Sequence, residues 1–226
     1  MATHYSPKIA TDGLVLCLDA GDKNSYPGSG TTWTDLSGNG YNHTLYNGAG
    51  LTTIGGISCL DCTGDNYILV DAGTTLTYGN NHTIIAWAYT LTDAQVSTWR
   101  TLWRTTPDDH PLLIQDETDT IGYYDNNSAG FVSYGLTAAG TGIAGNWAMI
   151  SLIGTSGTDT AVYINEGTTN GTVGYNTTGN SQGSIGNIGG GSQPYGYIAA
   201  AYAYNRILSI TEITQNFNAH RHRFGI

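Results

Sequence analysis

Positive charge is scarce in this 226-residue chain. It has 7 Lys and Arg residues against 17 Asp and Glu residues, and its formal net charge is −10 at pH 7. Proteins that bind nucleic acids contact the phosphates through basic patches, and anionic membrane surfaces attract the same side chains. The composition therefore argues against a nucleic-acid partner and against a membrane-surface partner.

Cysteine is also scarce, with Cys17, Cys59 and Cys62 as the three examples. An odd number is poor material for a disulfide framework, and the pair Cys59–Cys62 lacks the second pair that would complete a zinc site. Residues three apart on a strand point to opposite faces, so we expect three small buried side chains and no redox motif. We expect the protein to be made in a reducing compartment.

Long apolar runs are missing. No run approaches the ~20 residues that a membrane-spanning helix needs. The first residues, MATHYSPKIATDG, contain no apolar segment of the kind found in secretion signals. We therefore expect synthesis in the cytoplasm, without a signal peptide or a transmembrane segment.

Glycine, by contrast, is abundant, with 32 residues. Turn signals such as GNG, NNSAG and GGGS separate short runs that are rich in β-branched and aromatic residues. Regular short strands without alternating helices indicate an all-β sandwich. The expected strands cover residues 13–20, 43–46, 66–70, 82–90, 100–104, 111–114, 120–124, 130–135, 147–154, 160–165 and 195–205.

One helix is predicted near the end of the chain. Ser209 followed three residues later by Glu212 is a capping box, and Leu208 is placed to pack on Ile213 as a hydrophobic staple. Ile210, Ile213 and Phe217 then fall on one helical face. The run His-Arg-His-Arg at 220–223 suits the negative end of the helix dipole better than it suits a metal site.

Several segments of the chain carry a family resemblance. They are GLVLCLDA, ISCLDCTGDNYILV, HTIIAWAY, AVYINEG and the closing YGYIAAAYAYN with its helix. Together they resemble the concanavalin A-like lectin/glucanase superfamily, in its laminin-G-like jelly-roll branch, although Cys62 stands where glycine is usual and Asn66 where a second Asp is usual. The resemblance implies a two-sheet antiparallel jelly-roll sandwich with one short C-terminal helix. We expect one such domain over residues 13–226, preceded by an N-terminal arm, 1–12, that is held around 5–9 by the domain or by a neighbouring subunit.

The sequences of the two ends, SPKIATDGLVLCLDA and NAHRHRFGI, resemble those of proteins of marine bacteriophages, especially phages of cyanobacteria. This resemblance implies a non-enzymatic structural protein of the virion, such as a capsid decoration or a tail-associated protein. Its expected partners are other virion proteins and copies of itself. The alternative is an adhesin of the same fold that binds glycans of the host surface.

The stretch WTDLSGNGYNHTLYNG, residues 33–48, raises the question of a phosphate or metal loop. It matches neither GxGxxG nor a Walker motif, because His43 takes the place of the last glycine and no GK[ST] follows. Superfamily members often hold a structural calcium ion, and Asp35 and Asn39 are candidate ligands here. Asp and Asn also cap turns without a metal, so both readings stay open.

Catalysis is not expected. Retaining glycosidases need two carboxylates about 5–5.5 Å apart, and the enzymes of the superfamily carry them as ExDxxE on one strand. The nearest match is Glu117-Thr118-Asp119, in which Gly122 stands at the place of the third acid. Glu166 falls in a predicted hairpin turn and Glu212 in the capping box, so neither fills the pattern.

Aromatic residues are the remaining candidates for contact with a partner or a glycan. The chain has 16 Tyr and 5 Trp, and aromatic rings suit both ordinary strands and the apolar face of a sugar. Trp87 and Trp147 match core positions of the family. The candidates in or near loops are Tyr41, Tyr46, Trp99, Trp103, Tyr123 and Tyr124.

Overall fold

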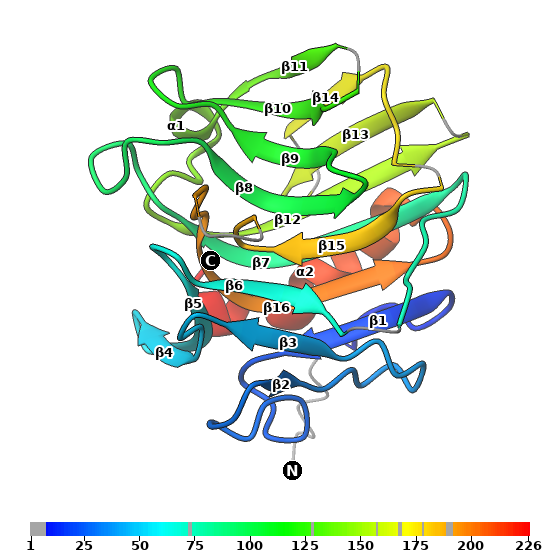
Figure 1. Cartoon of the computed structure of the whole chain (residues 1–226). Helices are drawn as coiled ribbons and strands as arrows, with labels where there is room; N and C mark the ends of the chain where they lie inside the picture. The colour runs from blue at the N-terminus through cyan, green and yellow to red at the C-terminus, as the bar shows by residue number, and fades with distance from the viewer. Residues whose placement is uncertain are drawn as a thin grey trace.

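Two antiparallel sheets pack face to face in the computed structural model, which describes residues 8–71, 74–127, 129–156, 158–166, 169–177, 179–188 and 192–226 (Figure 1). The front sheet, nearer the viewer in Figure 1, contains in spatial order β11 (Gly130–Thr137), β10 (Thr120–Asp125), β9 (His110–Ile114), β8 (Arg100–Thr106), β15 (Ser181–Ile185), β6 (Tyr67–Val70), β3 (His43–Tyr46) and β2 (Thr32–Trp33). The back sheet contains β14 (Thr169–Val173), β13 (Asp159–Ile164), β12 (Trp147–Thr155), β7 (His82–Thr90), β16 (Gly196–Tyr204), β5 (Ile57–Cys62) and β4 (Leu51–Ile54), with β1 (Leu14–Asp19) paired to β16. The predicted all-β sandwich fold is confirmed.

Most of the predicted strands lie where the sequence pattern placed them. β3 and β7 match their predicted ranges, 43–46 and 82–90, at both ends. β2, β4, β5, β14 and β15 were not predicted as strands, and neither was the four-residue helix α1 (Ala138–Thr141). Apart from β5, whose sequence ISCLDC is largely buried, the missed strands are short, polar or rich in glycine and threonine, so they carry little apolar periodicity.

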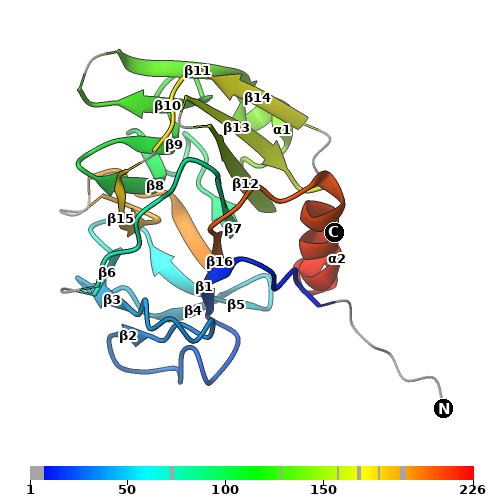
Figure 2. The same cartoon turned by 90° about the vertical axis from the view of Figure 1, so that its right-hand side faces the viewer.

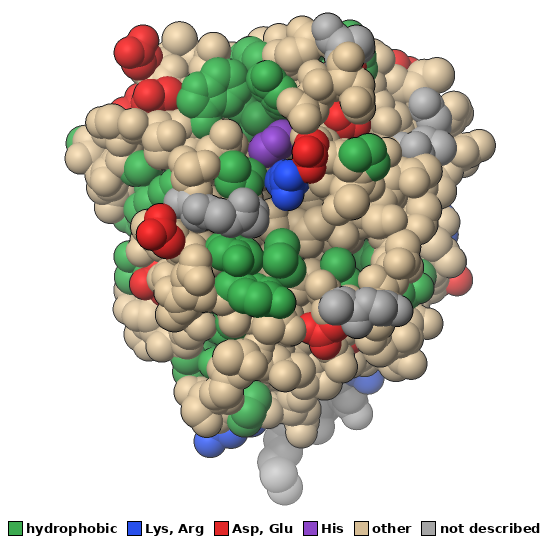
Figure 3. Space-filling model, in the orientation of Figure 1, with side chains coloured by type: hydrophobic (Ala, Val, Ile, Leu, Met, Phe, Trp, Pro, Cys, Tyr) green, Lys and Arg blue, Asp and Glu red, His purple; other side chains and the backbone are tan. Residues whose placement is uncertain are grey.

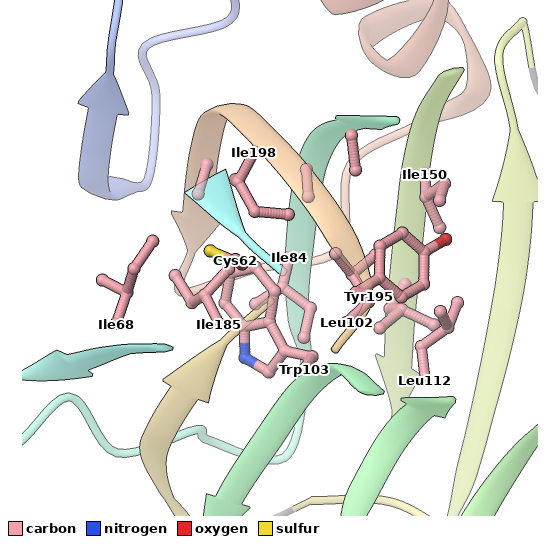
Figure 4. Packing of buried hydrophobic residues seen from close by; sticks show 14 of the residues in the cluster. Cys62, Ile68, Ile84, Leu102, Trp103, Leu112, Ile150, Ile185, Tyr195 and Ile198 are labelled. Carbon is pink, nitrogen blue, oxygen red and sulfur yellow. The ribbon is translucent and has the colours of Figure 1, made fainter. Parts of the chain in front are cut away.

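The main core fills the space between the two sheets. Alternate residues of β7 and β12 point into it, so that Ile84 of β7 and Ile150 of β12 are buried there. Figure 4 shows Trp103 of the front sheet packed among Ile185, Ile84 and Cys62. Trp103 is 1 % exposed, so the packing of the two sheets leaves its ring no access to solvent.

A second core lies between the outer face of the back sheet and helix α2 (Ile210–Phe224), which Figure 2 shows against that sheet. Trp87 stacks on Phe224 with ring centroids 4.0 Å apart and on Phe217 at 5.7 Å. The predicted capping box is present, because the Ser209 side chain accepts from the Glu212 N–H and the Glu212 side chain accepts from the Ser209 N–H. Burying the apolar stripe of α2 therefore covers a face of the sandwich that would otherwise be exposed.

The three cysteines are free thiols. Cys62 faces the main core and Cys59 faces the second core, as the three-residue spacing predicts. Burial raises the pKa of Cys59 to about 12, with a smaller opposing effect from a backbone hydrogen bond at Ile54. Burial, reinforced by Asp19, also raises the pKa of Cys17 to about 12. These thiols are held in their unreactive protonated form.

The described part of the N-terminal arm, from Lys8 onward, is tied to α2 and to β16. The Ala10 N–H donates to Asn216 Oδ1 at 2.7 Å, and Tyr204 Oη donates to the Ala10 carbonyl at 2.9 Å. Gln215 Nε2 donates to the Lys8 carbonyl at 2.8 Å. The prediction that the arm is held concerned residues 5–9, and residues 1–7 lie outside the described residues. Among the described residues, no helix is both long enough and apolar enough to cross a membrane.

Candidate functional site

The outer face of the front sheet has a hollow of about 270 Å³. Figure 3 shows this face, with hydrophobic side chains grouped beside a histidine and a pair of opposite charges. We call the hollow the aromatic pocket. It is lined by Trp99, His110, Leu113, Tyr124, Asn126 and Gln193.

Edge-to-face contacts hold the rings of the aromatic pocket. The Trp99 ring lies 5.8 Å from Tyr124 and 5.5 Å from Phe131, with an interplanar angle of 87° to each. His110 meets Tyr124 at 5.8 Å and 81°. These are the separations and angles that aromatic pairs prefer, because the positive edge of one ring faces the negative face of the other. Trp99 is therefore fixed without being buried.

Gly122 makes room for Phe131. A Cβ atom added to Gly122 would lie 2.2 Å from Cε2 of Phe131, so the phenyl ring lies directly over this glycine. Gly122 is the residue that stands where the catalytic pattern of the superfamily has its third acid. In this chain that place on the sheet is covered by an aromatic ring.

A hydrogen-bond chain fixes the polar wall of the aromatic pocket. Thr101 Oγ1 donates to Gln193 Oε1 at 2.6 Å and lies 3.0 Å from His110 Nδ1. Because the hydroxyl hydrogen is used on Gln193, the Nδ1–H of His110 must donate to Thr101, and its Nε2 carries a lone pair. Burial lowers the pKa of His110 to about 4, with Arg104 adding to the effect and Asp108 opposing it. His110 is therefore neutral at pH 7.

The charged groups near the aromatic pocket are engaged, either in an ion pair or in hydrogen bonds to neutral groups. Arg104 Nη2 bonds Asp108 Oδ1, and Asp109 accepts from the Asn126 N–H at 3.1 Å and from Asn180 Nδ2 at 2.9 Å. No residue among the described ones that line the pocket is Lys or Arg. The pocket thus offers aromatic faces, two amides and a neutral imidazole, and no unpaired cation.

The structure separates the six predicted aromatic contact residues. Trp99 and Tyr124 come together in the aromatic pocket. Trp103 and Tyr123 are each 1 % exposed in the main core, so the prediction that they contact a ligand was wrong. The remaining two candidates lie outside the pocket: Tyr41 is half-buried against the main core, and Tyr46 is 39 % exposed.

Sequence reasoning missed five residues of this site, namely His110, Leu113, Asn126 and Gln193 of the lining and Phe131 beside Trp99. His110 directly precedes a predicted strand, which is the one signal that could have found it. Gln193 comes from the segment before β16 and reaches the pocket through the hydrogen bond from the Thr101 N–H to its carbonyl, at 3.0 Å. A contact between residues 92 positions apart has no local signature in the sequence.

Four hydrogen-bond donors surround Asp35. Its Oδ1 accepts from the N–H groups of Cys17 and Ser37 at 2.9 Å, and its Oδ2 accepts from Ser37 Oγ at 2.7 Å and from the Tyr41 N–H at 3.1 Å. Asn39 Nδ2 donates to the Val15 carbonyl at 3.2 Å. The connection between β2 and β3, residues 34–42, is therefore built around one carboxylate.

Calcium binding at Asp35 and Asn39 stays a prediction. Among the residues that the structure describes, no three His, Cys, Asp or Glu side chains come together as a ligand set. An oxygen shell at this turn would have to be completed by backbone carbonyls and water, and the ion would compete with the donors that Asp35 already holds.

The acids of the nearest catalytic pattern lie in the hairpin between β9 and β10. Glu117 is exposed there with φ 62°. Asp119 Oδ1 lies 2.8 Å from Nη2 of the fully buried Arg100, and its Oδ2 accepts from the Ala139 N–H at 2.8 Å. Asp119 thus holds the hairpin against β8 and α1.

Comparisons with known proteins show the fold and no family. No protein-family model matches the chain, and no curated protein matches its sequence. A Trypanosoma rangeli sialidase in complex with the inhibitor DANA aligns with a TM-score of 0.65 at 16% identity, over 92% of this chain and 33% of that chain. The binding domain of botulinum neurotoxin DC in complex with SialylT aligns with a TM-score of 0.62 at 16% identity, over 93% of this chain and 52% of that chain. The chain spans about a third of the sialidase and about half of the toxin domain, and at this identity the likeness shows a shared β-sandwich fold.

Proposed function

We propose that the protein is a non-catalytic carbohydrate-binding protein that holds a sugar in the aromatic pocket of the front sheet. The observation that carries the proposal is the arrangement of Trp99, Tyr124 and Phe131 beside the amides of Asn126 and Gln193. The apolar face of a sugar ring packs on an aromatic ring, while amides bond the hydroxyl groups. The pocket is concave and its rings are fixed by one another, so little order has to be gained on binding.

The charge of the surroundings favours a neutral sugar. An acidic sugar such as a sialic acid brings a carboxylate, whose desolvation needs a cation or several donors. Arg104 is paired with Asp108, Arg100 is fully buried, and the formal net charge of the chain is −10. The proposed ligand class therefore differs from that of the sialidase and of the toxin domain named above.

The proposal includes no glycoside hydrolysis because the acids of the nearest catalytic pattern lie away from the aromatic pocket. Asp119 is engaged with Arg100, and Gly122 is covered by Phe131. Among the described residues that line the aromatic pocket, none is Asp or Glu, so the lining does not supply the pair of carboxylates that most glycoside hydrolases use.

A place on a phage particle is compatible with this proposal and is supported by the resemblance of the chain ends to marine phage proteins. A sugar-binding module displayed on a virion would act as an adhesin, in several copies whose combined binding is stronger than that of one. Gradient-purified particles analysed by mass spectrometry test this part. The protein should co-purify with them, and finding it solely in the lysate would remove the virion role.

A glycan array tests the binding proposal. The purified protein should bind arrayed neutral glycans and leave their sialylated counterparts unbound, and Trp99→Ala should remove the signal. Trp147→Ala is the matched control, because Trp147 is a partly exposed tryptophan on the back sheet. Binding to sialylated glycans alone would refute the neutral class, and binding to no glycan at all would refute the function.

A further inference from the structure

A pair of tyrosines stands on the same outer face as the aromatic pocket. Tyr46 of β3 and Tyr67 of β6 are directly opposite each other in the sheet, and their rings stack at 5.0 Å with an interplanar angle of 8°. Their strand neighbours Leu45 and Ile68 point into the main core, so the two rings point outward. Tyr46 is 39 % exposed. We call Tyr46 and Tyr67 the tyrosine pair.

The tyrosine pair and the aromatic pocket lie at the same level across the sheet. Gly122, under the Phe131 ring, is paired with Leu113, and Leu113 is paired with Thr101. Beyond β8, the N–H of Gly186, the residue that follows β15, donates to the Leu102 carbonyl at 2.9 Å. Gly186 directly follows Ile185, which is paired with Ile68 next to Tyr67. A line drawn perpendicular to the strands therefore runs from Phe131 to the tyrosine pair.

The distance along this line is set by the sheet itself. Four strand intervals separate β10 from β6, in the order β10, β9, β8, β15 and β6. At about 4.8 Å per interval the span is roughly 19 Å. This is much longer than a disaccharide and shorter than an extended hexasaccharide.

Gln193 of the aromatic pocket presents an amide that is held on both sides. Gln193 is bonded to Thr101 of β8 through its carbonyl and its side chain, and its N–H donates to Asn187 Oδ1 at 2.9 Å. Asn187 Nδ2 in turn donates to the carbonyls of Gly64 and Asn66 at 3.0 and 2.9 Å. A chain of hydrogen bonds thus leads from Gln193 of the aromatic pocket through Asn187 to Asn66, the residue before Tyr67.

The strands that carry the tyrosine pair offer no charge to a ligand. β3 has the sequence HTLY and β6 the sequence YILV, and their one titratable side chain besides the tyrosines is His43, which is fully buried. Two stacked rings on an uncharged strip suit a sugar ring better than an ionic partner.

We propose that the tyrosine pair is a second sugar subsite, so that the front face binds an extended neutral polysaccharide chain that runs across the strands from the aromatic pocket. The proposal rests on the proposed function and specifies its ligand: a linear neutral glycan of more than four residues, and not a terminal mono- or disaccharide. Occupation of both subsites by one chain converts the second contact into an intramolecular one, so that affinity rises with chain length.

Chain-length dependence tests the second subsite. The probes are neutral oligosaccharide series of glucose, mannose, galactose and N-acetylglucosamine, each with two and six residues, measured by isothermal titration calorimetry. The hexasaccharide of the bound series should bind at least tenfold more tightly than the disaccharide. The double variant Tyr46→Ala/Tyr67→Ala should reduce that ratio to within about threefold, and it should leave the affinity for the disaccharide unchanged because the disaccharide occupies the aromatic pocket alone. A tenfold change in affinity corresponds to about 1.4 kcal/mol of binding free energy.

Control variants separate this proposal from the function on which it rests. Trp99→Ala should weaken both chain lengths, Tyr46→Phe/Tyr67→Phe should keep the length dependence, and Tyr163→Ala removes a tyrosine from the back sheet as the matched control. Equal affinity for both lengths, or a length dependence that survives in Tyr46→Ala/Tyr67→Ala, would overturn the second subsite while disaccharide binding upheld the function. Failure of every probe to bind would overturn both.

Discussion

The buried imidazole of His43 makes the stability of the protein dependent on pH. His43 is 0% exposed, its ring Nδ1 is 2.9 Å from the Tyr41 carbonyl, and its Nε2 meets Nε2 of Gln182. The carbonyl requires an Nδ1–H donor and the amide nitrogen requires an Nε2 acceptor, so the site selects the neutral ring. Burial lowers the pKa of His43 from 6.5 to about 4, against the weaker opposing effects of the Tyr41 hydrogen bond, Asp71 and Asp35.

The size and sign of the effect follow from linkage. Above pH 6.5 the ring is neutral in the folded and the unfolded chain, and its pKa shift has no effect on the free energy of unfolding. Between pH 6.5 and 4 the unfolded chain binds a proton at this ring and the folded chain does not, so the free energy of unfolding decreases as the pH is lowered. A pKa difference from 6.5 to about 4 corresponds to a loss of about 3 kcal/mol by pH 4.

Urea denaturation of the wild type and of His43→Asn, followed by circular dichroism between pH 8 and 4, measures this loss. The variant should be less stable at pH 8 because it forfeits buried hydrogen bonds, and its disadvantage should shrink by about 3 kcal/mol by pH 4. The pKa values of His82, His110 and His220 are also lowered by burial, but these residues are present in both proteins and their effects cancel. Parallel curves for the two proteins would refute the reasoning. The exposed His222, changed to Asn, is the control for the loss of an imidazole outside the core.

Three further perturbations test other parts of the structure. Millimolar calcium should raise the Tm of the wild type and not that of Asp35→Ala. Binding to the folded state alone adds about 2.7 kcal/mol to the free energy of unfolding when calcium is at 100 times its Kd. Identical Tm values of the wild type in calcium and in chelator would remove Asp35 from the candidate ligands. Gly122→Ala should displace Phe131 and cost about 1–3 kcal/mol in urea denaturation, and an unchanged stability would show that the ring is not packed on this glycine. Asn216→Ala should leave the Ala10 N–H without its acceptor, cost about 1–3 kcal/mol and speed proteolysis of the N-terminal segment, and an unchanged rate would show that this bond does not hold the arm.

Much of the fold was predictable because the relevant signals are local. The strand 82–90 is a continuous run of apolar and β-branched residues, and it proved to be buried along most of its length at the centre of the back sheet. The start of helix α2 was predictable from the capping box of Ser209 and Glu212. β15, with the sequence SQGSI, carries one large apolar residue, and pairing with β8 and β6 is what makes it a strand.

The candidate site was harder to predict because it depends on which face each side chain takes. Simple alternation places Trp99 and Trp103 on the same face of a strand. The pairing of β8 with β9 shifts register between Thr101 and Trp103, so that Leu102 and Trp103 both reach the main core. Tyr123 and Tyr124 are neighbours on one strand and therefore point to opposite faces. The sequence identifies such residues as aromatic, and the face that each takes in the sheet decides which of them line the pocket.

Calorimetric titration of a neutral oligosaccharide into the wild type and into Trp99→Ala tests the central claim most directly. We expect the wild type to bind the sugar saturably. The affinity of Trp99→Ala should be lower by about tenfold or more, as expected when an aromatic side chain at the centre of a binding site is removed. The control Trp147→Ala should keep the affinity of the wild type. Equal binding by the wild type and Trp99→Ala would show that the sugar lies elsewhere and would contradict the account.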